Sequence, residues 1–277
     1  PDLIVEGGYV RADRTTLGAD DGIAVAMALA ILEDDSLKHP ALEVVFTTEE
    51  EVGMEGATGL DTTDLKAKYL LNIDSEVEGI FTAGCAGGIK ARAAFEVERE
   101  MREGTPVRLA ITGLKGGHSG AEIHKCRANA MILLGRVLFA LHQEIDLSIV
   151  KVWGGAKDNA IPVEAYADLV IDLEDEEQLQ AIVDGFAADL AVEFRTSDPA
   201  ISVTTTVKEA EEVPVFTRIL AEKIIFMLMQ IPNCIQTMSA DLPGLVESSL
   251  NLGILETTED EVAFTWAIRS SVNSLKY

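Results

Sequence analysis

Carboxylate side chains cluster where predicted elements of this chain end. Glu49, Glu50 and Glu51 directly follow residues 41–48, a segment with a short apolar run at residues 42–46 that reads as an interior strand. Adjacent carboxylates repel one another and lose hydration on burial, so they either remain in water or meet a cation. Open α/β sheets bind ligands at the carboxyl ends of their strands. A solvated acidic turn and a metal site with an adjacent general base are therefore both open for this stretch.

Two further carboxylate clusters lie at similar boundaries. Asp20 and Asp21, in LGADDG, precede an apolar helical pattern, and Asp74 follows the strand-like run YLLNI at residues 69–73. An N-cap accounts for one of the two adjacent aspartates but not readily for both. The three clusters converge if the two strands are parallel neighbours and the helix begins beside them. Carboxylate-rich sites suit Mg, Mn or Ca, whereas zinc sites more often include His or Cys.

The elements that must position these groups alternate between strand and helix. The pattern predicts a helix at residues 22–34 and strands at residues 41–48 and 69–74. Such alternation indicates an α/β layer with a parallel sheet.

Glycine density rises sharply at residues 84–88, which predicts a domain boundary there. We therefore expect one domain at residues 1–87 and a second at residues 88–277. The second has an α+β pattern with an antiparallel sheet. Its expected strands are residues 89–97, 107–112, 148–153, 165–171 and 201–207, its helices are residues 128–142, 176–194 and 215–229, and residues 248–255 and 262–268 form a hairpin.

Composition limits the class of protein. The chain has 277 residues, 48% of them hydrophobic, which is typical of a globular protein. Its formal net charge of −25 opposes binding to nucleic acid or to an anionic membrane, because both need a positive surface. The three cysteines, Cys85, Cys126 and Cys234, are widely spaced, which favours reduced thiols in a cytoplasmic protein. No apolar run is long enough to span a bilayer.

Several motifs occur in an order that resembles the M20 metallopeptidases, most closely the aminoacyl-histidine (Xaa-His) dipeptidases, or peptidase D. They are LGADDG, TTEEEVGMEGA, LLNIDSE, CAGGIK, GLKGGHSG, NAIP, LVESSLNLG and IRSS. The resemblance implies a parallel-type α/β catalytic domain, present in part at residues 1–87. It implies an inserted α+β lid or dimerisation domain at residues 88–277. It further implies a cytoplasmic homodimer that hydrolyses small peptides ending in histidine.

The resemblance also assigns roles at the carboxylate clusters. It implies two divalent metal ions, zinc in the family, with Asp20 as the bridging ligand and Glu51 and Asp74 as further ligands. Glu50 is then the general base that takes a proton from the metal-activated water. A cis peptide bond between Asp20 and Asp21 is expected as well.

Three residues of the second domain match functional positions of the family. His118, in GGHSG, helps to polarise the scissile carbonyl, while Asn159 and Arg269 bind substrate. A guanidinium group suits the terminal carboxylate of a peptide. Without the resemblance, His118 reads as a surface-loop residue and Arg269 as a charge at the end of a strand.

Two features of the family pattern are missing. The family has an H-x-D motif before LGAD and a final His ligand near the C-terminus. The four histidines of this chain, His39, His118, His124 and His142, supply neither. The chain is therefore expected to be a central fragment, and a non-catalytic lid or dimerisation module stays open as the alternative to an enzyme.

Overall fold

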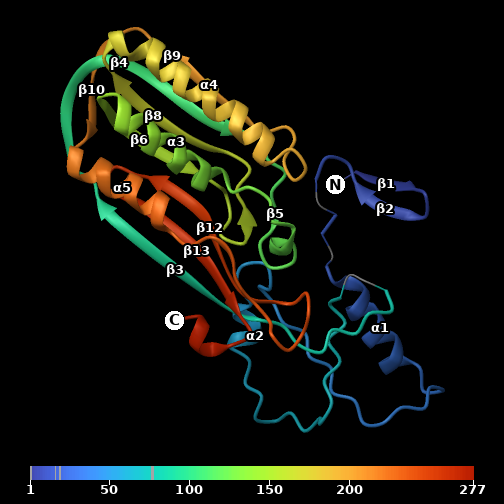
Figure 1. Cartoon of the computed structure of the whole chain (residues 1–277). Coiled ribbons are helices and arrows are strands. Elements are labelled where there is room, and N and C mark those ends of the chain that lie inside the picture. The colour runs from blue at the N-terminus through green and yellow to red at the C-terminus, as the bar shows by residue number, and fades with distance from the viewer. Residues whose placement is uncertain (1, 16, 19, 76–77) are drawn as a thin grey trace. The chain divides into compact units, whose positions relative to one another are not determined.

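The computed structural model describes residues 2–15, 17–18, 20–75 and 78–277 (Figure 1). The chain divides into two compact units, Pro1–Ala83 and Gly84–Tyr277. The division falls at the start of the glycine-rich stretch, a few residues before the boundary expected from the sequence. Each unit is described separately below.

The larger unit is built on a nine-stranded sheet whose pairings are all antiparallel. The sheet runs in the order β10-β4-β8-β6-β12-β13-β3, with β9 beside β4 and β11 beside β12. Its strands are β3 (Gly87–Glu96), β4 (Arg99–Thr112), β6 (Leu147–Gly154), β8 (Ala165–Ile171), β9 (Ser202–Val207), β10 (Glu211–Phe216), β11 (Cys234–Met238), β12 (Val246–Thr257) and β13 (Glu261–Ser270). The predicted α+β pattern with an antiparallel sheet is thus confirmed.

Three helices cover one face of this sheet (Figure 1). They are α3 (Ala130–Glu144), α4 (Glu176–Glu193) and α5 (Arg218–Gln230). All three lie within a few residues of their predicted positions. The sequence did not indicate β10, whose last two residues were expected to be helical. Strand β10 contains Pro214, which lacks an N–H group, and a proline is tolerated at the edge of a sheet.

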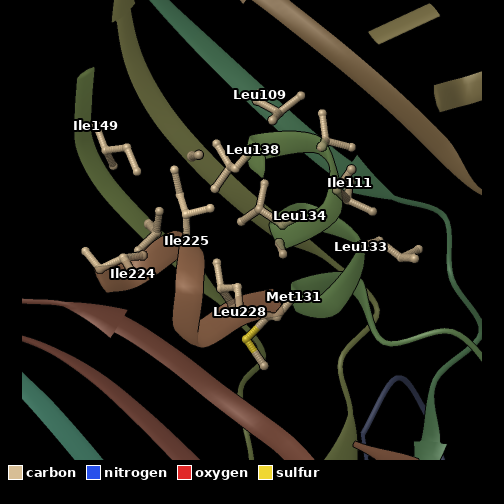
Figure 2. Close-up of a cluster of buried hydrophobic side chains, with 14 of the residues drawn as sticks. Leu109, Ile111, Met131, Leu133, Leu134, Leu138, Ile149, Ile224, Ile225 and Leu228 are labelled. Atoms are coloured by element: carbon tan, nitrogen blue, oxygen red, sulfur yellow. The ribbon is translucent and has the colours of Figure 1, made fainter. Parts of the chain in front are cut away.

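Helices α3 and α5 meet at a glycine, within a cluster of buried side chains that includes Leu134, Leu138 and Ile224 (Figure 2). A Cβ atom added to Gly135 would lie 2.5 Å from the Cβ of Leu228 and 3.1 Å from its carbonyl carbon. The two helix backbones therefore approach closely only because residue 135 has no side chain.

We expect Gly135→Ala to lower the free energy of unfolding by about 1–3 kcal/mol, the usual cost of overpacking a core. This loss should exceed the gain of about 0.5–1 kcal/mol that alanine brings within a helix. The matched control is Gly185→Ala in α4, where no atom lies within 4 Å of the added Cβ, so stability should rise instead. Urea unfolding of the two variants measures both changes, and a rise in stability for Gly135→Ala would contradict this packing argument.

The described residues of the smaller unit form a hairpin followed by two helices. Strands β1 (Leu3–Glu6) and β2 (Tyr9–Ala12) pair antiparallel, with Gly7 and Gly8 between them at positive φ. Helix α1 (Gly22–Glu33) confirms the helix predicted at this position, and α2 (Glu55–Thr58) is a single turn.

The prediction of strands at residues 41–48 and 69–74 was wrong, because neither segment pairs with a neighbouring strand. In place of backbone pairing, the carboxylate of Glu43 accepts hydrogen bonds from the backbone N–H groups of Lys66 and Ala67 at 2.6–3.0 Å. No parallel pair of strands occurs among the described residues, so the expected parallel layer is not formed. The broader class, a mixed α/β protein with a large sheet, is confirmed.

The apolar side chains of these two segments are not buried. Phe46 is 53% exposed and Tyr69 is 91% exposed. The strand prediction rested on burial, which this structure does not provide for either segment. Among the described residues, no helix combines the length and the apolar character needed to cross a membrane.

Candidate functional site

Two of the predicted metal ligands, Asp20 and Asp74, line the same pocket, whose volume is about 260 Å³. The pocket lies within the smaller unit, where the start of α1 meets the end of the 69–73 segment. Its lining residues are Gly18, Asp20, Asp21, Ile23, Ile73, Asp74 and Ser75.

Local hydrogen bonds explain how the two carboxylates reach this pocket. The side chain of Asp21 is the N-cap of α1, accepting the backbone N–H of Ala24 at 2.8 Å. Asp21 is therefore the capping aspartate, and the side chain of Asp20 has no part in the cap. The peptide bond between Asp20 and Asp21 is cis, as predicted. At the other segment, the N–H of Asp74 donates to the side-chain oxygen of Asn72 at 3.0 Å, which turns the chain there.

Carboxylate oxygens are ligands that divalent cations accept, so the chemistry of Asp20 and Asp74 fits a metal ion. Bringing two carboxylates to one pocket costs repulsion that a cation would relieve. Within the described part of the chain, however, no group of three or more His, Cys, Asp or Glu side chains is placed to hold a metal. The pocket thus offers a pair of donors and not a complete ligand set.

Glu50 and Glu51 lie outside this pocket, in an exposed turn. The turn is closed by backbone hydrogen bonds from Gly53 to the carbonyl of Glu50 at 3.1 Å and from Met54 to the carbonyl of Glu49 at 2.9 Å. The expected meeting of these glutamates with the other carboxylates requires the strand at residues 41–48, which is not formed. Their roles as base and ligand stay predictions.

Glycine also shapes the segment that follows this turn. A Cβ atom on Gly56, in α2, would lie 2.4 Å from the carbonyl oxygen of Thr48. The single turn of α2 therefore packs directly on the backbone that precedes the three glutamates. Only a glycine at position 56 permits this approach.

The larger unit brings its predicted site residues together. Strands β5 (Gly117–His118) and β7 (Ala160–Ile161) pair so that His118 lies opposite Ala160. Next to this pair, the N–H of Ser119 donates to the carbonyl oxygen of Asn159 at 2.8 Å. The backbones that carry His118 and Asn159 are therefore neighbours.

Arg269 reaches the same place from β13. A Cβ atom on Gly120 would lie 2.9 Å from the Cζ of Arg269 and 2.9 Å from the Cε1 of His118. The guanidinium and the imidazole thus both lie against Gly120. Because Gly120 has no side chain, both side chains can converge there.

Unpaired polar atoms occur in this cluster. The Nε of Arg269 and the Oγ of Ser119 are buried and have no hydrogen-bond partner among the described residues. A buried polar group without a partner costs about 1–3 kcal/mol. Both donors belong to the surroundings of Gly120, since Ser119 precedes it in the chain and the Nε of Arg269 would lie 3.0 Å from a Cβ atom there. They indicate a place for a ligand with acceptor oxygens, such as a carboxylate.

The hydrogen bonds of His118 define which ring nitrogen can donate. Its Nδ1 accepts the N–H of Ala121 at 3.1 Å, so in the neutral imidazole the proton lies on Nε2. The backbone N–H of His118 donates to the carboxylate of Glu122 at 3.2 Å. A hydrogen bond from Lys125 lowers the pKa of Glu122, which keeps this carboxylate ionised as an acceptor.

Sequence reasoning missed Asn251, which supports this cluster from β12. Its Nδ2 donates to the carbonyl oxygens of Asp158 at 3.0 Å and of Ala160 at 2.8 Å, on either side of Asn159. Asn251 is only 1% exposed. The sequence offered one signal for Asn251: it is a polar residue within the apolar pattern of LVESSLNLG.

Comparisons with known proteins agree with the motifs. Residues 109–198 match the peptidase dimerisation domain of the M20 peptidases. Over 274 residues the chain is 36% identical to the cytosol non-specific dipeptidase of Escherichia coli strain K12. That match covers 98% of this chain and 56% of the relative. It is also 31% identical over 144 residues to peptidase T of Shigella boydii, covering 40% of this chain and 35% of that protein.

A solved structure gives the same result. The crystal structure of aminoacylhistidine dipeptidase from Vibrio alginolyticus matches with a TM-score of 0.79 and 38% identity. The match covers 98% of this chain and 56% of that one. The chain thus spans little more than half the length of these relatives.

Proposed function

The chain is related to the M20 peptidases, as its motifs predicted, and from this relationship we propose that it acts in a metal-dependent dipeptidase. The proposed substrates are dipeptides ending in histidine. The observation that carries the proposal is the convergence of His118, Asn159 and Arg269 around buried donors without partners. These donors suit the polar groups of a short peptide.

The metal-binding part of the proposal rests on Asp20, Glu51 and Asp74. These carboxylates would hold two divalent ions, zinc by resemblance to the family. Bound ions of this kind polarise a carbonyl group and lower the pKa of water. The pocket that Asp20 and Asp74 share supports their part in this, because it collects oxygen donors in one place.

The chain's own residues then move the protons. Glu50 would accept the proton of the attacking water on a carboxylate oxygen and pass it to the leaving amine. That role needs a carboxylate that is not held by other groups, and the exposed turn leaves the Glu50 side chain accessible. His118 would donate its Nε2 proton in a hydrogen bond to the oxygen on which negative charge develops.

Arg269 and Asn159 would bind the substrate, with the guanidinium on the terminal carboxylate. We expect Arg269→Ala to lower kcat/KM by about 10- to 150-fold, since a hydrogen bond to a charged group contributes about 1.5–3 kcal/mol. The matched control is Arg195→Ala, an exposed arginine outside the cluster. The effect should vanish for a dipeptide amide, which lacks the carboxylate, and an equal loss on both substrates would contradict this role.

The test of the proposed function is hydrolysis of a dipeptide panel, with metal content measured on the same sample. Cleavage of Xaa-His dipeptides that depends on a divalent ion supports the proposal. If the protein is purified without metal and still cleaves none of them after zinc or manganese is added, the result supports the alternative, a non-catalytic lid or dimerisation module. We also propose that the protein is a cytoplasmic homodimer. Light scattering of the purified protein tests whether it is a dimer.

A further inference from the structure

Two cysteines that are far apart in the sequence meet in the larger unit. Cys126 follows the 3₁₀ turn η1 (Ile123–Lys125), and Cys234 begins β11. The turn and the strand are in contact. The third cysteine, Cys85, is exposed and lies at the start of this unit.

A single carbonyl group connects the two cysteines. The carbonyl oxygen of Ile123 accepts the backbone N–H of Cys126 at 3.1 Å and lies 4.0 Å from the Sγ of Cys234. The φ angles of Cys126 and Cys234 are 48° and 70°, in the left-handed region that residues other than glycine rarely adopt. Such a conformation persists only where the surrounding structure fixes it.

Two asparagines provide that fixation beside the cysteines. The Oδ1 of Asn129 caps α3, and its Nδ2 donates to the Oδ1 of Asn233 at 3.3 Å. The same Oδ1 of Asn233 accepts the N–H of Leu252 in β12 at 3.0 Å. The segments that carry Cys126 and Cys234 are thus tied to each other and to the sheet.

The two thiols differ in environment. Cys126 is exposed, whereas Cys234 is partly buried. Burial raises the pKa of the Cys234 thiol; the backbone of Ile235 lowers it, and the nearby Cys126 raises it. An oxidant in solution therefore meets Cys126 first, and Cys234 is placed to react second.

We propose that Cys126 and Cys234 form a reversible dithiol–disulfide pair, a modification site separate from the candidate peptide and metal sites. The oxidant is a low-molecular-weight disulfide. The Cys126 thiolate attacks one of its sulfurs, forming a mixed disulfide and releasing one small thiolate. The Cys234 thiolate then attacks the Cys126 sulfur, and the second small thiolate leaves. The two protein thiols give up two electrons to the small disulfide, and their protons go to solvent.

The test is to incubate the folded protein with oxidised glutathione and to digest it without reduction under conditions that block free thiols. We expect a cross-linked peptide that joins Cys126 to Cys234, reversed by dithiothreitol. The bond closes the chain between residues 126 and 234, so the melting temperature should rise by roughly 5–15 °C. A stable mixed disulfide on Cys126 with Cys234 still free would overturn the proposal.

Matched variants separate the pair from the remaining cysteine. Cys85→Ser should leave the cross-link and the shift in melting temperature unchanged. Cys234→Ser should abolish both and leave a mixed disulfide on Cys126. A cross-link between Cys85 and Cys126 in the wild-type protein would also overturn the assignment. Because the main measurement uses the wild-type protein, it does not depend on the folding of any variant.

Discussion

Changing Glu50 to Gln is expected to lower the turnover of dipeptide hydrolysis by about 10²–10⁴-fold, the usual contribution of a general base. An amide cannot accept the proton of the attacking water, although it has the same shape as the carboxylate. Metal content should not change, because Glu50 is not assigned as a ligand. The residue lies in an exposed turn, so the substitution should leave the melting temperature unchanged.

The matched control is the neighbouring substitution, Glu51→Gln. A neutral amide is a poorer ligand than a carboxylate, so this variant should lose metal, and activity should return in part when metal is added in excess. Metal analysis beside steady-state kinetics distinguishes the two variants. If Glu50→Gln loses metal and Glu51→Gln retains it, the roles belong to Glu49 and Glu50 instead.

Replacing His118 with Ala is expected to lower kcat by about 10²–10³-fold, the typical cost of removing one donor to a developing oxyanion. The reason lies in the ring: Nδ1 already accepts a hydrogen bond from Ala121, which leaves the Nε2 proton for the substrate. KM should change less than kcat, because the charge on the carbonyl oxygen develops mainly in the transition state.

His124→Ala is the control for this prediction, since His124 lies in η1 a few residues away and is exposed. It should retain the wild-type kcat. A His118→Ala variant that folds normally and raises only KM would show that His118 binds substrate without stabilising the transition state.

Most of the fold of the larger unit could be predicted from its sequence because most of its elements carry their own pattern. Strand β3 alternates between half-buried and exposed residues along its whole length, and α3 carries a continuous apolar face. These are local signals that do not depend on distant partners. Strand β11 carries no such signal, because its pairing with β12 includes register shifts.

The smaller unit shows where local patterns are insufficient. Residues 42–46 and 69–73 have the composition of buried strands, yet a strand also needs a neighbour for its backbone groups. Here the Glu43 side chain bonds to the backbone of Lys66 and Ala67, and no ladder forms. The expected meeting of all four carboxylates depended on that sheet, and the pocket gathers only Asp20 and Asp74 of the four.

The candidate peptide site shows the opposite case. Resemblance to a family singled out His118, Asn159 and Arg269, but nothing in the spacing of three residues so far apart required them to meet. The pairing of β5 with β7 and the small size of Gly120 bring them together. Asn251 escaped notice because its role, two hydrogen bonds to the loop around Asn159, exists only in the folded chain.

The most direct test of metal-dependent dipeptide hydrolysis is a single titration of activity against metal. The protein is stripped with a chelator, and hydrolysis of an Xaa-His dipeptide is followed as zinc is returned in steps. We predict no turnover in the stripped protein and a rise that saturates near two metal ions per chain, a rise that Asp74→Asn should weaken. Turnover that persists without metal, or that is absent at every metal concentration, would contradict the proposed function.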